Sequence, residues 1–500
     1  MRRRVFQAET LFGPEITERE LLGIAKELGA EEVPGWGQSE RALLRDLPRP
    51  GRTLVNEFRA SILAGGDPMG DAFCEIRSRE HRRQLGATYT PHLVVRAMLD
   101  WCTVHQPPAR VVDPGCGSAR FLLDAASRFP RASLVGIDVD PVASIIARGN
   151  LSAFNLAGRS EVKLLDFRDL KLHEQFSPTL FVGNPPYVRH HQIEPKWKHW
   201  LTQKARGLGL PVSQLCGLHL HFFLATALLA KPGDFGAYIT AAEWMDVNYG
   251  ELLRKLAIRQ LGVRSVTVVE PTAQPFPNAT TTACITSFLL GKPQKTISFY
   301  RVASAAALGK LPEPKRVSTE RLESESRWSI FTTSGSRVPK GYVELGELCR
   351  VHRGQVTGAN DVWIADPTVE LPQQVLFPTV TRARELFAAG TRLADATRLR
   401  RVVDLPVDLD VLEKADRRLV DSFLVIAKAK GADRGYVAEK RRAWWSVGLR
   451  TPAPILCTYM ARRPPAFVEN DVHARHINIA HGLYPREPLA KTLIGRLVAF

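Results

Sequence analysis

Cysteine is scarce in this sequence, and its distribution excludes several kinds of site. Seven cysteines are scattered over 500 residues, an odd number with no Cys-x-x-Cys pair. This pattern argues against a zinc site and against a disulfide framework. We therefore expect that the protein requires no metal and works in a reducing cytoplasm.

Long apolar runs are lacking as well. No stretch reaches the ~20 apolar residues that cross a bilayer, and the basic start, Met1 to Val5, is not followed by the apolar core of a secretory signal. We expect no membrane partner. Hydrophobic residues still make up 45% of the chain, which is typical of globular proteins, and the length indicates two or three domains.

Acidic residues are the minority charge. The chain has 51 Asp and Glu against 68 Lys and Arg, a formal net charge of +17. Such an excess favours a polyanionic partner, with nucleic acid ahead of an anionic membrane surface. A basic surface that binds nothing is the alternative that charge alone leaves open.

Periodicity divides the chain into four parts. Residues 1–80 show helical periodicity and no nuclease motif, and residues 81–292 alternate between apolar strands and helices. Residues 293–339 are polar and include Pro312 and Pro314, so we predict a linker there. Residues 340–500, rich in arginine and aromatic residues, are predicted to form a separate domain.

The alternating part predicts an α/β fold, a mostly parallel, doubly wound and Rossmann-like sheet. Its clearest segments are short apolar runs, each followed by polar or glycine-containing residues. The expected strands are residues 110–113, 133–138, 162–165, 179–182, 236–240, 263–269 and 284–290.

A glycine turn follows the first expected strand. Asp113 ends this strand, and Gly115 and Gly117 let the backbone approach a ligand closely. Open α/β sheets bind nucleotides at this position, and Asp138, which ends the next strand, is placed to accept hydrogen bonds from ribose hydroxyls. The residues predict a cofactor that contains adenosine. The pattern departs from Gly-x-Gly-x-x-Gly, which counts against NAD.

Asp166 and Phe167 end the third expected strand. A carboxylate there can accept a hydrogen bond from an adenine amino group, and an aromatic ring can pack on the face of the base. The structural alternative is a strand-end acid followed by a core phenylalanine. The pair taken alone favours the structural alternative.

The fourth expected strand ends in Asn184, Pro185, Pro186 and Tyr187. An aromatic amine is a poor nucleophile, because its lone pair is delocalised into the ring. The Asn184 side-chain oxygen and the Pro185 carbonyl can accept hydrogen bonds from both of its N–H groups, and two prolines stiffen the loop that carries these acceptors. Tyr187 offers a ring for stacking. The tetrapeptide therefore predicts methylation of a planar nitrogen, with positioning supplying much of the acceleration.

In their order, these motifs resemble those of the gamma-class N6-adenine DNA methyltransferases of bacterial restriction–modification systems. The resemblance runs from about residue 80 to the end and implies S-adenosyl-L-methionine as cofactor. It implies that Asn184, Pro185 and Tyr187 are catalytic and that Pro186 and Phe276 bind the substrate, with Phe276 stacking on a flipped adenine. The implied cofactor-binding residues are Thr88, Tyr89, Thr90, Asp113, Gly115, Gly117, Asp138, Asp166 and Phe167.

The sequence departs from the family pattern at two positions. Ala119 stands where the family usually has glycine, a change we expect a helix start to tolerate. His219 stands where an aromatic residue is common, and we expect a packed histidine there, not a catalytic base. The mechanism outlined above needs no base.

The carboxyl half resembles the target-recognition part of the same family. Residues 353–361 match its glycine loop, and residues 441–484 are also similar. The resemblance implies an α+β recognition domain that binds double-stranded DNA. At least one of Trp444 and Trp445 is expected in the core.

The resemblance implies a site-specific adenine methyltransferase, the modification enzyme of a restriction–modification system. We expect a separately encoded endonuclease or none. RNA base methylation, methylation of a protein glutamine, and a non-catalytic DNA-binding subunit are the alternatives.

Overall fold

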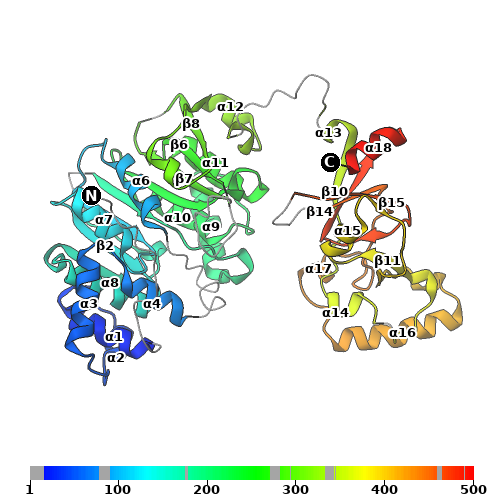
Figure 1. Cartoon of the computed structure of the whole chain (residues 1–500), viewed down its shortest axis with the longest axis horizontal. Helices are drawn as coiled ribbons and strands as arrows, with labels where there is room; N and C mark the ends of the chain where they lie inside the picture. Colours follow the sequence, from blue (N-terminus) through cyan, green and yellow to red (C-terminus); the bar gives the residue numbers. More distant parts are fainter. Residues whose placement is uncertain are drawn as a thin grey trace, which may run out of the picture. The chain divides into compact units, whose positions relative to one another are not determined.

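The computed structural model describes most of the chain. The described residues are 16–77, 90–174, 178–270, 282–292, 294–332, 343, 345–366, 368–458, 464–488 and 490–499. The chain divides into two compact units, residues 1–335 and 336–500 (Figure 1). The division lies close to residue 340, where the sequence predicts the start of a separate domain.

A nine-stranded sheet forms the centre of the first unit, in the order β3-β2-β1-β4-β5-β7-β6-β8-β9. The five strands from β3 to β5 run parallel to their neighbours, whereas β7 is antiparallel to both β5 and β6. The expected mostly parallel, doubly wound sheet is confirmed. The strands are β1 (Arg110–Pro114), β2 (Ser133–Asp138), β3 (Ser160–Leu164), β4 (Thr179–Gly183), β5 (Phe235–Ala241), β6 (Val263–Val269), β7 (Ala283–Leu289), β8 (Thr296–Val302) and β9 (Lys315–Ser318).

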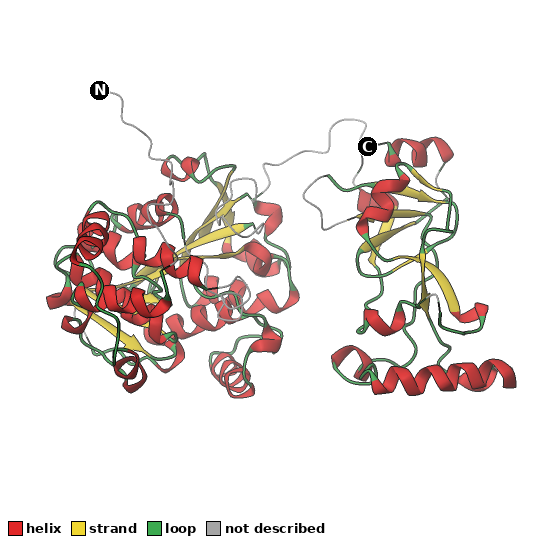
Figure 2. Ribbon diagram, turned by 60° about the horizontal axis from the view of Figure 1, so that its bottom comes forward, coloured by secondary structure: helices red, strands yellow, loops and turns green. Residues whose placement is uncertain are grey.

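Helices cover both faces of this sheet (Figure 2). One buried cluster joins the sheet to α6 (His92–Cys102), α7 (Arg120–Arg128) and α8 (Pro141–Ala153). The opposite cluster contains side chains of α9 (Pro195–Gly207), α10 (Leu218–Leu229) and α11 (Glu251–Arg259). Two buried faces explain why the central strands read as continuous apolar runs.

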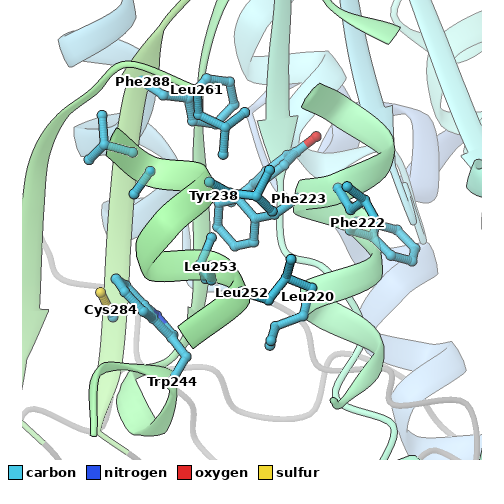
Figure 3. Packing of buried hydrophobic residues seen from close by; sticks show 14 of the residues in the cluster. Leu220, Phe222, Phe223, Tyr238, Trp244, Leu252, Leu253, Leu261, Cys284 and Phe288 are labelled. Atoms are coloured by element: carbon cyan, nitrogen blue, oxygen red, sulfur yellow. The ribbon is translucent and has the colours of Figure 1, made fainter. Parts of the chain in front are cut away.

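Aromatic side chains fill the core between α10, α11 and the sheet, as Figure 3 shows. The rings of Phe223 and Tyr238 lie 5.2 Å apart, and those of Tyr238 and Phe288 lie 5.6 Å apart, each pair in an edge-to-face arrangement. Residues 219–226 of α10 are all buried. The N–H of Leu218, the first residue of α10, donates to the Val188 carbonyl at 2.9 Å, so this helix contacts the loop that follows β4.

The N-terminal helices, residues 18–76, are packed onto the sheet-covering helix α8. Val142 and Ile146 of α8 belong to the same buried cluster as Leu21 and Phe58. The expectation of helices before residue 80 agrees with the structure, and these helices are part of the first unit. They are α1 (Glu18–Glu27), α2 (Gln38–Leu43), α3 (Arg52–Leu63) and α4 (Pro68–Ile76).

The linker expected over residues 293–339 is wrong for most of its described length. Strand β8 pairs in parallel with β6, β9 pairs with β8, and α12 (Thr319–Ser324) follows. Trp328 is fully buried, 5.8 Å from the ring of Trp244, and its indole N–H donates to the Leu322 carbonyl. The sequence signal was weak because β8 alternates exposed and buried positions and its stabilising partners are remote in the chain.

The second unit has the expected α+β composition. It contains a five-stranded sheet, β10-β17-β14-β15-β12, and a three-stranded sheet, β13-β11-β16. Its strands are β10 (Cys349–Arg353), β11 (Leu376–Val380), β12 (Arg392–Leu393), β13 (Arg400–Val403), β14 (Ile455–Thr458), β15 (Phe467–Asn470), β16 (Arg475–His476) and β17 (Ala480–Pro485). Its helices are α13 (Leu345–Leu348), α14 (Asn360–Trp363), α15 (Ala383–Ala389), α16 (Lys414–Ala429), α17 (Tyr436–Glu439) and α18 (Lys491–Val498).

Both tryptophans of the pair at 444–445 pack against the core of the second unit. Trp444 lies 6.2 Å from the buried ring of Trp363, and the indole N–H of Trp445 donates to the Pro406 carbonyl at 3.0 Å. The expectation of a core role is thus met by both residues.

Within the described ranges, no helix has the length and apolar character needed to span a membrane.

Candidate active site

The glycine turn lies between β1 and α7 and requires unusual backbone angles. Gly115 and Gly117 have φ values of +87° and +55°, and Ala119 also has a positive φ of +68°. The N–H groups of Gly115 and Cys116 both donate to the Ile137 carbonyl, at 2.7 and 2.9 Å. Ala119 therefore stands in a conformation that favours glycine, which accounts for the family's preference and gives the substitution an energetic cost of about 1 kcal/mol.

Asp138 lies next to this turn at the end of β2. Its carboxylate accepts the N–H of Gly117 and the N–H of Asp140, each at 2.9 Å. Burial raises the pKa of Asp138 to about 6, although these backbone hydrogen bonds oppose the shift. Each oxygen keeps lone-pair capacity for a further donor, so the position suits the two hydroxyls of a ribose.

Asp113 is fully buried at the end of β1. Its two carboxyl oxygens have no hydrogen-bond partner among the described residues. Gly183 of β4 faces this carboxyl so closely that a Cβ there would lie 2.5 Å from Oδ1. Burial, and then the charge of Asp138, raises the pKa of Asp113 well above its usual range. A buried carboxyl without a partner fits a site whose ligand brings hydrogen-bond donors.

Asn184 follows β4 and is held by Thr90. Its side-chain nitrogen Nδ2 donates to the Thr90 hydroxyl at 3.1 Å. Thr90 is 3% exposed, and its carbonyl accepts Nη1 of Arg120 at 2.9 Å. Thr88 and Tyr89, expected in the same motif, lie outside the described residues, so only Thr90 of this motif is placed against the tetrapeptide.

The prolines bring the tetrapeptide up to the glycine turn. A Cβ on Gly115 would lie 3.7 Å from Cδ of Pro186, so the two loops are in van der Waals range of each other. Pro185 is buried and Pro186 is half-buried. The glycine turn and the tetrapeptide therefore share one edge of the sheet, at the carboxyl ends of β1 and β4.

Tyr187 is half-buried, and its hydroxyl donates to the Ile239 carbonyl at 3.4 Å. Burial raises the pKa of this phenol well above its usual range. Its ring lies 6.4 Å from His219, which is 3% exposed and whose pKa burial lowers to about 4. His219 is therefore a packed residue, as expected.

Asp166 forms an ion pair that the sequence did not indicate. Its carboxylate accepts Nε and Nη2 of Arg168 at 2.8 and 2.6 Å. The guanidinium of Arg168 lies 3.8 Å from the ring centroid of Trp197 on α9 and contacts Nδ1 of His221 at 3.2 Å. A ligand that uses Asp166 therefore meets an acid that already has a strong partner.

Phe167 is 2% exposed, and its ring lies 5.2 Å from that of Phe222. This packing corresponds to the structural alternative of a core phenylalanine.

Phe276, expected to stack on the substrate, lies outside the described residues. Across the described ranges, no group of three or more His, Cys, Asp or Glu side chains is arranged to hold a metal ion.

Two segments that are remote in the sequence meet in the second unit. Strand β10, which opens the glycine loop at 353–361, pairs with β17. Gln355 forms a bridge with Ile477 and accepts the N–H of Asn478 at 3.0 Å. Arg441 donates to the carbonyls of Val356 and Thr357, at 3.1 and 2.8 Å. The recognition-like segments thus form one substructure, in which Arg441 supports the loop.

The strand order with a reversed β7, the glycine turn, the acid that ends β2 and the tetrapeptide after β4 define a class I S-adenosylmethionine-dependent methyltransferase fold. The tetrapeptide and the turn meet at the carboxyl ends of β1 and β4, the edge at which open α/β sheets bind their ligands.

Comparison with known proteins gives the family. Residues 132–270 match the model of the Eco57I restriction-modification methylase family, and residues 336–498 match that of the C-terminal domain of type II methyltransferase M.Eco57I. The chain is 46% identical over 496 residues to type II methyltransferase M.XamI of Xanthomonas campestris pv. amaranthicola, covering 97% of this chain and 92% of that protein. The protein therefore belongs to the type II methyltransferases of restriction–modification systems.

Two further similarities are more distant. Type II methyltransferase M.AccI of Acinetobacter calcoaceticus is 21% identical over 420 residues, covering 81% of this chain and 76% of that protein. The solved structure of the type IIL restriction-modification enzyme MmeI, in complex with DNA, superposes with a TM-score of 0.54 at 13% identity, covering 96% of this chain and 80% of that chain. At that identity the superposition supports the fold alone.

Proposed function

We propose that this methyltransferase transfers the methyl group of S-adenosyl-L-methionine to N6 of an adenine in double-stranded DNA and modifies a specific site for a restriction–modification system. The observation that carries the proposal is the fixed amide of Asn184, held by Thr90 beside the glycine turn. Family membership and the net charge of +17 support DNA as the substrate.

The acceptor chemistry rests on the two ends of the Asn184 amide. Because Nδ2 donates to Thr90, the amide presents Oδ1 as its acceptor end. Oδ1 and the Pro185 carbonyl then accept the two N–H groups of the adenine amine, which draws the nitrogen toward tetrahedral geometry and frees its lone pair for an in-line attack. Tyr187 and Phe276 are proposed to stack on the base.

The cofactor pocket is proposed to lie along the carboxyl ends of β1, β2 and β3. Asp138 would hold the ribose, and the oxygens of Asp113, which have no hydrogen-bond partner among the described residues, would offer acceptors for donors on the cofactor. Asp166 would contact the adenine, and Thr88, Tyr89 and Thr90 the methionine part. Phe167, which is 2% exposed, would contribute through packing beside Asp166. When bound, S-adenosyl-L-methionine supplies an electrophilic methyl group on a sulfonium.

A base inside a duplex is out of reach of these acceptors, so the proposal includes flipping of the target adenine. The second unit is proposed to recognise the DNA sequence, with the loop supported by Arg441 as part of the reading surface. A separately encoded endonuclease is proposed as the functional partner in the same system.

Methyl-transfer assays with tritiated cofactor, run in parallel on three kinds of acceptor, test the substrate class. Wild-type protein is incubated with labelled cofactor and with duplex DNA, RNA or protein acceptors, and the labelled nucleosides are then separated. Label in N6-methyldeoxyadenosine is expected. Label only in RNA or in protein would overturn the proposal and favour one of the two other nitrogen-methylating classes.

A further inference from the structure

A buried carboxylate in the N-terminal helices contacts the active-site loops. Asp67 caps α4 by accepting the N–H of Gly70 at 2.9 Å, yet it also accepts Nε and Nη2 of Arg120 at 3.0 and 2.8 Å. It also accepts the hydroxyl of Ser118 in the glycine turn, and Nδ2 of Asn150 at 3.2 Å. Its side chain is only 1% exposed. A helix cap needs one such acceptor, so four further donors call for another explanation.

Arg120 extends this network toward the tetrapeptide. Its Nη2 and Nε bind Asp67, and its third nitrogen, Nη1, donates to the Thr90 carbonyl at 2.9 Å. The guanidinium is planar, so fixing two nitrogens on a buried carboxylate also fixes the direction of the third. The backbone of Thr90 is thereby held from the side of the N-terminal helices.

Thr90 passes this constraint to the acceptor amide, because its hydroxyl accepts Nδ2 of Asn184. We propose that Asp67 is a positioning residue for methyl transfer, which acts through Arg120 and Thr90 to hold the Asn184 amide in its acceptor orientation. The inference rests on the proposed function, since it assigns Asn184 the role of accepting the substrate's N–H. Catalytic groups must be held to within about 0.5 Å by packing and supporting hydrogen bonds, and the chain of contacts from Asp67 to Asn184 is of that kind.

A second contact of the same helices supports the idea that they brace the active site. Arg77 donates to Glu18 and to Asp140, and the N–H of Asp140 donates to Asp138. The N-terminal helices thus contact the glycine turn after β1 and the loop after β2. Asp71 provides a contrast, because it also lies 3.2 Å from Arg120 but its side chain is 72% exposed.

The test compares Asp67→Asn with Asp71→Asn at saturating cofactor and DNA. Asparagine keeps the shape of Asp67 but removes its charge, so Arg120 loses its fixed anchor. We expect kcat to fall by 10- to 100-fold in Asp67→Asn, with KM for DNA within threefold, and no change in Asp71→Asn. Equal kcat in the two variants would overturn the proposal.

A double variant separates positioning from general destabilisation. Thr90→Val removes the hydroxyl that holds Asn184, so Asp67→Asn should lower kcat no more than threefold further in that background. Fully multiplicative losses would show that Asp67 acts by another route. Glu40→Gln breaks the buried ion pair with Arg148, which also joins the N-terminal helices to the sheet, and it should lower stability while leaving kcat unchanged.

The test has a replacement variant and a replacement substrate. If Asp67→Asn does not fold, Arg120→Lys replaces it, because lysine keeps the charge but cannot bind Asp67 and Thr90 together. If the wild type does not methylate DNA, the proposed function fails by itself, and the same ratio of rates is measured on the acceptor that is methylated. Failure of the positioning role would appear only in the ratio of kcat in the Asp67→Asn variant to kcat in the wild type.

Discussion

The side-chain nitrogen of Asn184 donates a hydrogen bond to the hydroxyl of Thr90 across 3.1 Å. This contact joins a residue after β4 to a residue before α6, and it fixes the orientation of the amide so that Oδ1 is its acceptor end. The contact therefore connects the fold to the chemistry of the proposed reaction.

Asn184→Ala is expected to lower methyl transfer by at least about a thousandfold, because it removes one preorganised acceptor and loosens the loop around the target amine. Single-turnover rates measure the effect. Affinity for cofactor and for DNA should stay within about threefold of the wild type. A variant that keeps full activity would remove Asn184 from the reaction.

Cofactor affinity is expected to weaken below pH 6. Burial raises the pKa of Asp138 to about 6, so protonation at lower pH removes a ribose acceptor, and Kd should rise about tenfold at pH 5. The stability of the cofactor-free protein is expected to depend on pH in the opposite direction. Because the pKa of Asp138 is raised in the folded state, its contribution to the free energy of unfolding is present at low pH and is lost as the pH rises through 6. Calorimetric titration at several pH values measures the Kd for the cofactor. If the Kd of an Asp138→Asn variant depends on pH as that of the wild type does, the role assigned to Asp138 is contradicted.

Trp328→Ala is expected to lower the free energy of unfolding of the first unit by about 3–5 kcal/mol, because it empties a fully buried site between Trp244 and Phe299. The control is Ile330→Ala, two residues along, whose side chain is 44% exposed and whose loss should cost under about 1 kcal/mol. Thermal unfolding of the two variants makes the comparison. Similar costs would mean that residues 296–332 do not belong to the core.

Arg441→Met is expected to weaken sequence-specific DNA binding, because the carbonyls of Val356 and Thr357 lose the donor that supports their loop. The matched control is Arg442→Met, at an exposed neighbouring position. The ratio of specific to non-specific Kd at fixed salt is the measurement. An equal change in both variants would indicate a general charge effect, not support of the loop.

The central sheet and the cofactor turn were predictable from sequence because their signals are local. The strands β1, β2 and β4 end in Asp113-Pro114, Asp138 and Gly183, and parallel strands bring those ends to one edge. Each strand from β1 to β7 overlaps its expected segment to within two residues at either end.

The parts that sequence reasoning missed depend on remote partners. Asp67 reads as a helix cap before Pro68, and nothing nearby in the chain indicates that Arg120 and Ser118 converge on it. The pairing of Asp166 with Arg168 is local, but its stacking on Trp197 is not. The segment of β8 resembles a linker in sequence because its half-exposed pattern needs β6 beside it to form a stable strand.

Direct identification of the modified base tests the central claim. Duplex DNA treated with the protein and S-adenosyl-L-methionine is digested and its nucleosides analysed, and DNA from cells expressing the gene is sequenced for modified positions. N6-methyladenine at one recurring sequence, absent with Asn184→Ala, is the predicted result. Methylated cytosine, methylation confined to RNA or protein, or undiminished N6-methyladenine with Asn184→Ala would contradict it.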